Sequence, residues 1–228
     1  MDHADLRAQL VREANRLQPL GLATGTSGNL SVRLAIGAHG GMLITPSGMA
    51  YDTLQPTDMV PVQFTGPGTA CWDHALDPSS EWLMHQAVYQ ARPEAGAVVH
   101  GHPTYATVLA IQGLEIPALH YMIAAAGGAP IRCAPYHTYG TAELSTAAVA
   151  ALEGRKACLL AHHGLLAFER DLARAMWLAA EVETLAQQTV MCRALGGPRV
   201  LPAAEIDVVV GKFAHYGLKA RPSRRPGP

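Results

Sequence analysis

Two short and almost wholly apolar runs constrain the fold of this chain more than any other feature. The runs are GAVVH (96–100) and ACLLAHHG (157–164). Apolar runs of this length are typical of strands buried inside a sheet. Because such a sheet needs a covering layer on each face, the runs predict helices on both sides of it.

Segments with helical or strand patterns surround the two runs. Further strands are expected at 30–34, 40–45 and 59–64. Helices are expected at 4–18, 77–93, 103–113 and 171–195. Strands and helices alternate irregularly and without a repeat. The pattern therefore predicts a single α/β domain, and it leaves the direction of the strands open.

The composition is that of a compact protein with little charge. Hydrophobic residues make up 49% of the 228 residues and charged residues only 15%. Such a surface leaves apolar area to be covered, which favours association between copies. The net charge of −1 gives no broad field that would attract nucleic acid or an anionic membrane, so neither partner is expected.

Cysteine usage and the first residues favour the cytoplasm. The four cysteines lie far apart without a CxxC motif, which predicts free thiols in a reducing compartment. Residues 1–17 carry charges throughout and lack an apolar signal core, and no run reaches transmembrane length.

The two buried runs end in histidines, which suggests a metal site. His100 and His102 are separated by Gly101, and residues i and i+2 of an extended strand point the same way. Both imidazoles can therefore reach one metal ion. His162 and His163 offer a third ligand, but spacing alone does not choose between these neighbours.

The other histidines have weaker settings. His85 follows Glu81 by one helical turn and is interpreted as a neighbour on the helix face. Solvated side chains are expected for His3, His39, His74 and His215, and no role is assigned to His120 or His137.

Three glycine and hydroxyl clusters can form either turns or an anion site. They are TGTSGN (24–29), TPSG (45–48) and PSSE (78–81), and none matches a nucleotide-binding loop. Glu81 closes the last cluster, at the start of a predicted helix. It is either a first-turn carboxylate favoured by the helix dipole or, beside a metal, a general base.

Taken together, the motifs resemble those of the class II aldolase/adducin family. They are GTSGNLSVR, MLITPSG, PSSEW, AVVHGHP, IPALHYMIAAAGG and RAMWLAAEVETLAQ, in that order. Within the family the sequence is most similar to the bacterial L-fuculose-phosphate aldolases. The resemblance implies a single domain over residues 1–218, followed by a basic, disordered tail at 219–228. The implied fold is a three-layer α/β/α sandwich around a central, mostly antiparallel β-sheet.

The activity that the resemblance implies is zinc-dependent cleavage of a ketose 1-phosphate, such as L-fuculose 1-phosphate. The products would be dihydroxyacetone phosphate and an aldehyde such as L-lactaldehyde. One Zn²⁺ per subunit would be held by His100, His102 and His163, with Glu81 as the base that moves protons. The phosphate would bind among Gly28, Asn29, Ser47, Gly48, Ser79 and Ser80.

The resemblance also implies a homotetramer with active sites between subunits. Tyr121 would come from a neighbouring subunit as the acid that protonates the aldehyde oxygen, and Tyr216 would lie near the site. A sugar-phosphate 4-epimerase or dehydratase of the same family is the main alternative, although the epimerases carry aspartate where this chain has Glu81. An adducin-like scaffold without catalysis is a more distant alternative, because such scaffolds do not keep the metal site.

Overall fold

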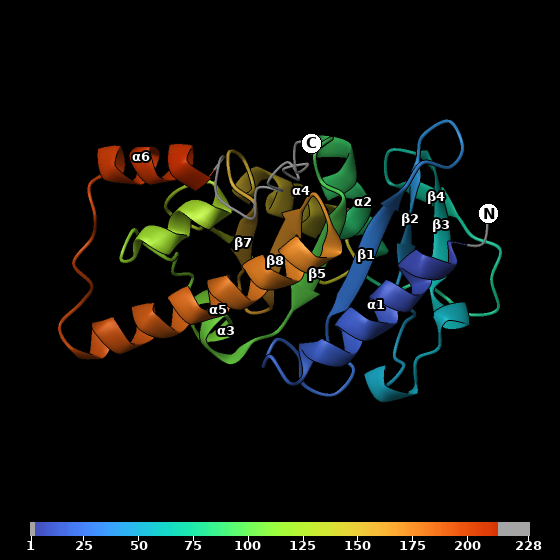
Figure 1. Cartoon of the computed structure of the whole chain (residues 1–228), viewed down its shortest axis with the longest axis horizontal. Coiled ribbons are helices and arrows are strands. Elements are labelled where there is room, and N and C mark those ends of the chain that lie inside the picture. The colour runs from blue at the N-terminus through green and yellow to red at the C-terminus, as the bar shows by residue number, and fades with distance from the viewer. Residues whose placement is uncertain (1–2, 214–228) are drawn as a thin grey trace, which may run out of the picture.

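A mixed sheet of eight strands forms the centre of the molecule (Figure 1). The computed structural model describes residues 3–213. The strand order is β4-β3-β2-β1-β5-β8-β7-β6. Among the described strands, β6 and β7 are parallel and all other neighbours are antiparallel. The strands are β1 (Asn29–Leu34), β2 (Gly41–Ile44), β3 (Val60–Gly66), β4 (Thr69–Cys71), β5 (Ala97–Gly101), β6 (Cys133–Ala134), β7 (Ala157–Leu160) and β8 (Gly164–Glu169).

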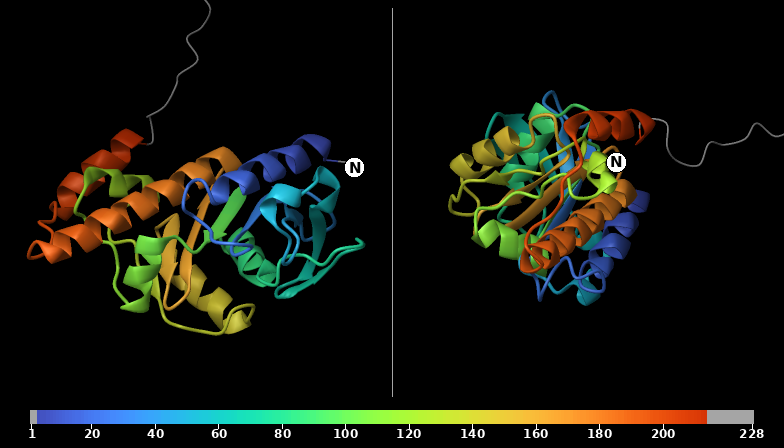
Figure 2. Two further views of the ribbon diagram at one scale, coloured as in Figure 1. Left: turned by 90° about the horizontal axis from the view of Figure 1, so that it is seen from below. Right: turned by 90° about the vertical axis from the view of Figure 1, so that its left-hand side faces the viewer.

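Helices cover both faces of this sheet (Figure 2). One face packs against α1 (Ala4–Leu17), α3 (Thr104–Ile111) and α5 (Leu172–Ala194). The other face packs against α2 (Trp82–Ala91) and α4 (Ala142–Ala151). The remaining helices of the described residues are three 3₁₀ helices and one α-helix: η1 (Tyr51–Thr53), η2 (Pro56–Asp58), η3 (Tyr121–Ala126) and α6 (Ala203–Phe213).

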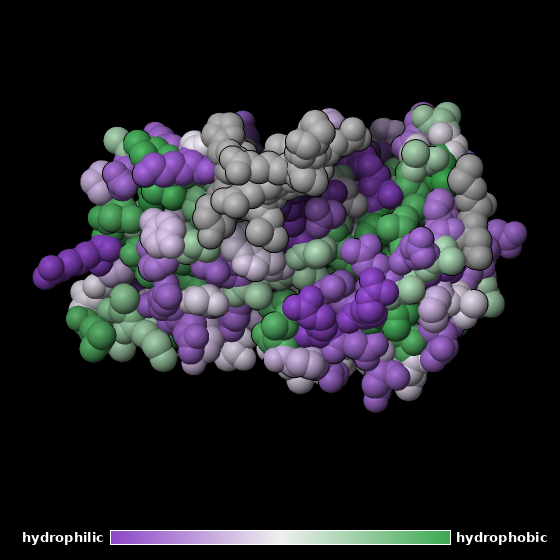
Figure 3. Space-filling view, in the orientation of Figure 1, coloured by the Kyte–Doolittle hydropathy of each residue, from purple (hydrophilic) through white to green (hydrophobic). Residues whose placement is uncertain are grey.

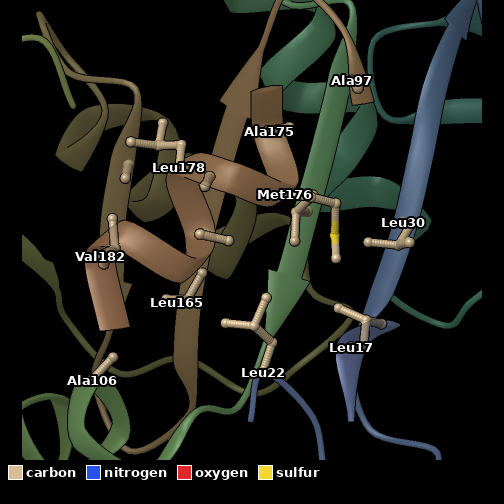
Figure 4. Packing of buried hydrophobic residues seen from close by; sticks show 14 of the residues in the cluster. Leu17, Leu22, Leu30, Ala97, Ala106, Leu165, Ala175, Met176, Leu178 and Val182 are labelled. Atoms are coloured by element: carbon tan, nitrogen blue, oxygen red, sulfur yellow. The ribbon is translucent and has the colours of Figure 1, made fainter. Parts of the chain in front are cut away.

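The central strands are buried on both faces, as their apolar sequences predict. Ala97 and Val99 of β5 belong to the cluster under α5, whereas Val98 belongs to the cluster under α2. Figure 4 shows the first cluster, in which Met176 and Leu178 of α5 point towards the strands. The predicted single-domain, three-layer and mostly antiparallel fold is thus confirmed. The domain boundary at 218 and the tail at 219–228 lie outside the described residues.

The predicted strand at 157–164 is too long. Strand β7 ends at Leu160, and residues 161–163 form a tight turn before β8 begins at Gly164. His162 has a φ of +54° in this turn, a left-handed backbone conformation that residues other than glycine rarely adopt. His162 and His163 are therefore separated by turn geometry and not by the alternation of a strand.

Polar and apolar side chains are mixed on the face that α1 and α5 cover (Figure 3). Large hydrophobic side chains that stay exposed include Trp177, Met191 and Leu195, on or just after α5. Within residues 3–213, no helix has both the length and the apolar character needed to cross a membrane.

Candidate active site

Three histidine rings converge where β5 meets the turn between β7 and β8. The ring centroids of His100, His102 and His163 lie 4.7 to 4.9 Å apart. One ligand atom from each of these rings and one from Glu81 all lie within 4.8 Å of one another. The turn directs His163 into the group. His162 lies instead against the ring of Tyr136, at a centroid distance of 5.9 Å.

The sheet fixes the orientation of His100. Its Nδ1 lies 2.8 Å from the carbonyl oxygen of Leu165 on β8, and a carbonyl can only accept. Nδ1 therefore donates, and Nε2 is the nitrogen that points towards His102, 3.0 Å away. A backbone contact of this kind is the usual way in which a metal-binding histidine is held.

Glu81 brings the fourth ligand atom from the other side. It occupies the N-cap position of α2 with only 6% of its surface exposed. Its Oε2 lies 3.0 Å from His100 Nε2, and its Oε1 lies 3.3 Å from His163 Nε2. Oε1 has no hydrogen-bond partner among the described residues, although it is buried.

The charges of this group favour a cation at its centre. Burial raises the pKa of Glu81, but the neighbouring His100 and His163 more than offset this and hold the pKa well below its usual range. Burial, reinforced by His100, lowers the pKa of His102 and of His163 to about 4. The site thus combines an ionised carboxylate with two imidazoles, those of His102 and His163, that are neutral at pH 7. Burial lowers the pKa of His100, but the neighbouring Glu81 more than offsets this and raises it. Three imidazole nitrogens beside a buried carboxylate fit a divalent metal ion of the zinc type.

A second polar group, formed by Asn29 and His85, lies next to Glu81. Asn29 Nδ2 donates to Glu81 Oε2 over 3.1 Å, and Asn29 Oδ1 lies 2.5 Å from Nε2 of His85. His85 is completely buried, and burial lowers its pKa to about 3. It lies on the helix one turn after Glu81 as expected, but on the inward face. The available signal was its spacing from Glu81, which does not show which way the helix faces.

The six residues predicted to bind phosphate all line one pocket next to this group. The pocket has a volume of about 330 Å³ and also includes Thr26 and Ser27. Two of the hydroxyl clusters are joined by a short antiparallel bridge between Pro46 and Pro78. The lining residues with predicted phosphate roles are Gly28, Asn29, Ser47, Gly48, Ser79 and Ser80.

Another part of the pocket lining is aromatic. Tyr136, His137, Tyr139 and His162 line it, and both tyrosines are exposed. Sequence reasoning did not identify these tyrosines, because they lie in an irregular segment that a strand or helix pattern does not describe.

Of the two tyrosines that the resemblance implicated, only Tyr121 belongs to the described residues, and it does not line this pocket. Tyr121 begins η3 with 51% of its surface exposed, and its ring stacks on His120. It is not among the pocket residues of its own chain. Tyr216 lies outside the described residues.

The chain is similar to known proteins over most of its length. Residues 8–190 match the model of the class II aldolase and adducin N-terminal domain. The chain is 50% identical over 216 residues to a 5-methylthioribulose-1-phosphate/5-deoxyribulose-1-phosphate aldolase of Rhodospirillum rubrum, covering 95% of this chain and 94% of that protein. It is 47% identical over 220 residues to the L-fuculose phosphate aldolase of Escherichia coli K12, covering 96% and 99%.

Solved structures show the same similarity. A structure of L-fuculose 1-phosphate aldolase superposes with a TM-score of 0.85 at 40% sequence identity. The match covers 92% of this chain and 96% of that one.

Proposed function

This chain belongs to the class II aldolase/adducin family, and from this premise we propose that it cleaves a ketose 1-phosphate reversibly into dihydroxyacetone phosphate and an aldehyde. One observation carries the proposal. A buried carboxylate, Glu81, converges with three histidines, and Glu81 and two of these histidines, His102 and His163, line a pocket that is rich in glycine and hydroxyl groups. The pocket therefore offers a reaction centre beside a place for a phosphate group.

We propose that the resident metal is Zn²⁺, one per subunit, held by His100, His102 and His163. The nitrogen ligands and the number of protein donors are those of catalytic zinc sites. When bound, the ion supplies Lewis-acid stabilisation of the negative charge that develops next to the substrate carbonyl.

The phosphate end of the substrate is proposed to bind at the wall formed by residues 26–29, 47–48 and 79–80. Backbone amides in turns and serine hydroxyls can hold a phosphate without a strong positive charge. Gly28 and Gly48 have positive φ values of 90° and 70°, so these turns need residues without a side chain. Binding energy at this remote group orients the reacting carbons.

Proton transfer is assigned to Glu81 and Tyr121. In the direction of synthesis, Glu81 removes a proton from the carbon that forms the new bond, and Tyr121 donates one to the aldehyde oxygen. Tyr121 does not line the pocket of its own chain. We therefore propose that it acts in the active site of a neighbouring subunit within a homotetramer. The exposed apolar residues Trp177 and Met191 support association between copies.

The aldehyde portion of the substrate is proposed to lie against the aromatic wall formed by Tyr136 and Tyr139. The names of the Rhodospirillum rubrum relative and of the L-fuculose 1-phosphate aldolase structure both specify a ketose with phosphate on carbon 1. L-Fuculose 1-phosphate and 5-deoxyribulose 1-phosphate are therefore the two substrates to compare. The cytoplasm is the proposed location, and the free state of all four cysteines supports it.

A substrate screen tests the proposal. The zinc-loaded protein is incubated with L-fuculose 1-phosphate, 5-deoxyribulose 1-phosphate or a pentulose 5-phosphate. Release of dihydroxyacetone phosphate is followed with a coupled dehydrogenase. We expect release from a 1-phosphate, abolished by a chelator and restored by zinc. Interconversion of 5-phosphates without release would instead identify an epimerase and contradict the proposal.

A further inference from the structure

A line of five buried or nearly buried polar side chains leads from the interior of the fold to the candidate base. It begins at Tyr89 on α2, passes through Ser31 of β1, His85 and Asn29, and ends at Glu81. The hydrogen bonds are Tyr89 Oη to Ser31 Oγ at 2.7 Å, Ser31 Oγ to His85 Nδ1 at 2.7 Å, His85 Nε2 to Asn29 Oδ1 at 2.5 Å and Asn29 Nδ2 to Glu81 Oε2 at 3.1 Å.

The charge of the Glu81 carboxylate determines which group donates and which accepts in every hydrogen bond of this line. An ionised carboxylate only accepts, so the amide NH₂ of Asn29 must face Glu81 and its carbonyl oxygen must face His85. His85 Nε2 must then carry the proton, which leaves Nδ1 as an acceptor. The single hydroxyl proton of Ser31 consequently points to His85, and Tyr89 donates to Ser31.

Burial favours the neutral form of His85, with a proton on Nε2 and none on Nδ1. The ring is completely buried, and each of its nitrogens has one partner with the required complementary role. A neutral imidazole with one donor and one acceptor satisfies both contacts. A protonated ring would have two donors and would carry an unpaired charge into the core.

From this geometry we propose that His85 is a positioning residue, which fixes the Asn29 amide so that its NH₂ group holds Oε2 of Glu81. The inference rests on the proposed role of Glu81 as the proton-transferring base. Without a donor at position 85, the carbonyl oxygen of Asn29 has no partner in the core. The amide is then free to turn or to swing into the pocket that Asn29 lines.

Holding one carboxylate oxygen has a consequence for the other. Asn29 and His100 both contact Oε2, whereas Oε1 lies 3.3 Å from His163 Nε2 and has no hydrogen-bond partner among the described residues. The line of hydrogen bonds thus sets the rotation of the carboxylate and leaves Oε1 as the oxygen available to exchange a proton. A base held in this way is aligned before the substrate binds, which is the usual role of residues behind a reacting group.

The test uses the zinc-loaded, full-length protein and three variants. His85→Phe keeps an aromatic ring but has no donor, and we expect its kcat to fall about 10–100-fold, as is typical when such supporting residues are lost. His85→Gln keeps an N–H near the position of Nε2, and we expect its kcat to stay within about fivefold of wild type. Tyr89→Phe is the matched control at the far end, since it loses a hydroxyl and leaves the contact between His85 and Asn29 in place.

Two NMR measurements test the inference without relying on activity. The ¹⁵N shifts of wild-type His85 should show a neutral ring protonated on Nε2. The side-chain amide protons of Asn29 should be protected from exchange in wild type and in His85→Gln, and should exchange faster in His85→Phe. If the protein cleaves no ketose phosphate, the proposed function fails while these measurements still decide the role of His85.

The outcomes that would overturn the proposal are specific. A ring protonated on Nδ1, unchanged Asn29 exchange in His85→Phe, or wild-type kcat in that variant would each contradict it. Equal losses of kcat in His85→Gln and His85→Phe would show that the ring fills space only. If His85→Phe does not fold, the tautomer in wild type and the kcat of His85→Gln decide between the two roles.

Discussion

Two adjacent histidines in the turn between β7 and β8 have different surroundings. His163 lies 3.3 Å from Glu81 Oε1, whereas His162 packs against Tyr136 at the rim of the pocket. The positive φ at position 162 turns the chain between them. A single residue step therefore separates a candidate ligand from a residue of the pocket wall.

This difference predicts opposite effects on metal content. His163→Ala should lose bound zinc, because two histidines and a carboxylate are left to hold the ion. His162→Asn should keep about one zinc per chain, because asparagine tolerates a positive φ. Metal content is measured by mass spectrometry of protein freed from loosely bound ions. Full zinc in His163→Ala would rule out its assignment as a ligand.

A glycine beside the candidate metal site has no room for a side chain. A Cβ at Gly164 would lie 2.3 Å from the carbonyl oxygen of Gly101 and 2.8 Å from Cδ2 of His102. The first conflict involves the backbone of β5, so relief requires the two strands to move apart.

Gly164→Ala should therefore both lower stability and weaken metal binding. A loss of about 1–3 kcal/mol in the free energy of unfolding is typical of overpacking a core. Gly211→Ala in α6 is the control, since within residues 3–213 no atom outside its own stretch of helix lies within 4 Å of its Cβ position, and alanine favours a helix. Denaturant unfolding and zinc titration measure both effects. An unchanged zinc affinity would show that the strands adjust without moving His102.

At the scale of the elements, α5 supports the start of α3. The N-cap residue of α3 is Pro103, which has no side-chain cap. Instead, the carboxylate of Glu183 on α5 accepts hydrogen bonds from the backbone amides of Tyr105 and Ala106, at 2.9 and 2.8 Å. The cap lies directly after His102 in the chain. It therefore ties the end of the metal-binding segment to the longest helix.

Removing this support should destabilise the protein. Glu183→Ala leaves two amides at the helix start without a partner and should cost about 1–2 kcal/mol of stability, as lost caps do. Glu181→Ala on the same helix is the control, because within residues 3–213 its side chain makes no hydrogen bond. Thermal and urea unfolding compare the two. Equal losses in both variants would show that α3 does not depend on the carboxylate of Glu183.

At the scale of the whole molecule, the question is whether one chain contains a complete active site. Glu81 lies in the pocket, but Tyr121 is half exposed elsewhere on the same chain. If both residues act in catalysis, each active site must contain Glu81 from one copy of the chain and Tyr121 from a neighbouring copy. Analytical ultracentrifugation should then show a tetramer.

A mixed oligomer tests this sharing directly. Glu81→Gln and Tyr121→Phe should each lose most activity, because each removes one proton-transferring group. The two variants are co-expressed with different tags. A site is restored when a Tyr121→Phe chain supplies Glu81 and a neighbouring Glu81→Gln chain supplies Tyr121, which holds for about a quarter of the sites in a random mixture. Recovered activity in the purified mixed oligomer is the expected result. No recovery, together with a confirmed mixed composition, would contradict a shared site.

Local sequence determined much of the architecture. The apolar runs around β5 and β7 specified strands buried on both faces, and the apolar stripe of α5 with its closing glycines specified a long helix. These features depend on burial and backbone preference, which a residue carries with it. The segments that became β4, β6, α4 and α6 carry weaker patterns, so their structure depends on the surfaces they pack against.

The candidate site divides in the same way. Spacing identified His100 and His102 as candidate ligands and left His162 and His163 equivalent, whereas the family resemblance implied His163 as the third ligand and Glu81 as the base. Only the tertiary structure turned His163 inward, placed His85 behind Glu81 and brought together three clusters from distant parts of the chain. The physical reason is that ligand geometry and hydrogen-bond direction depend on how β1, β5, β8 and α2 approach one another, and this long-range packing is not encoded in any one segment.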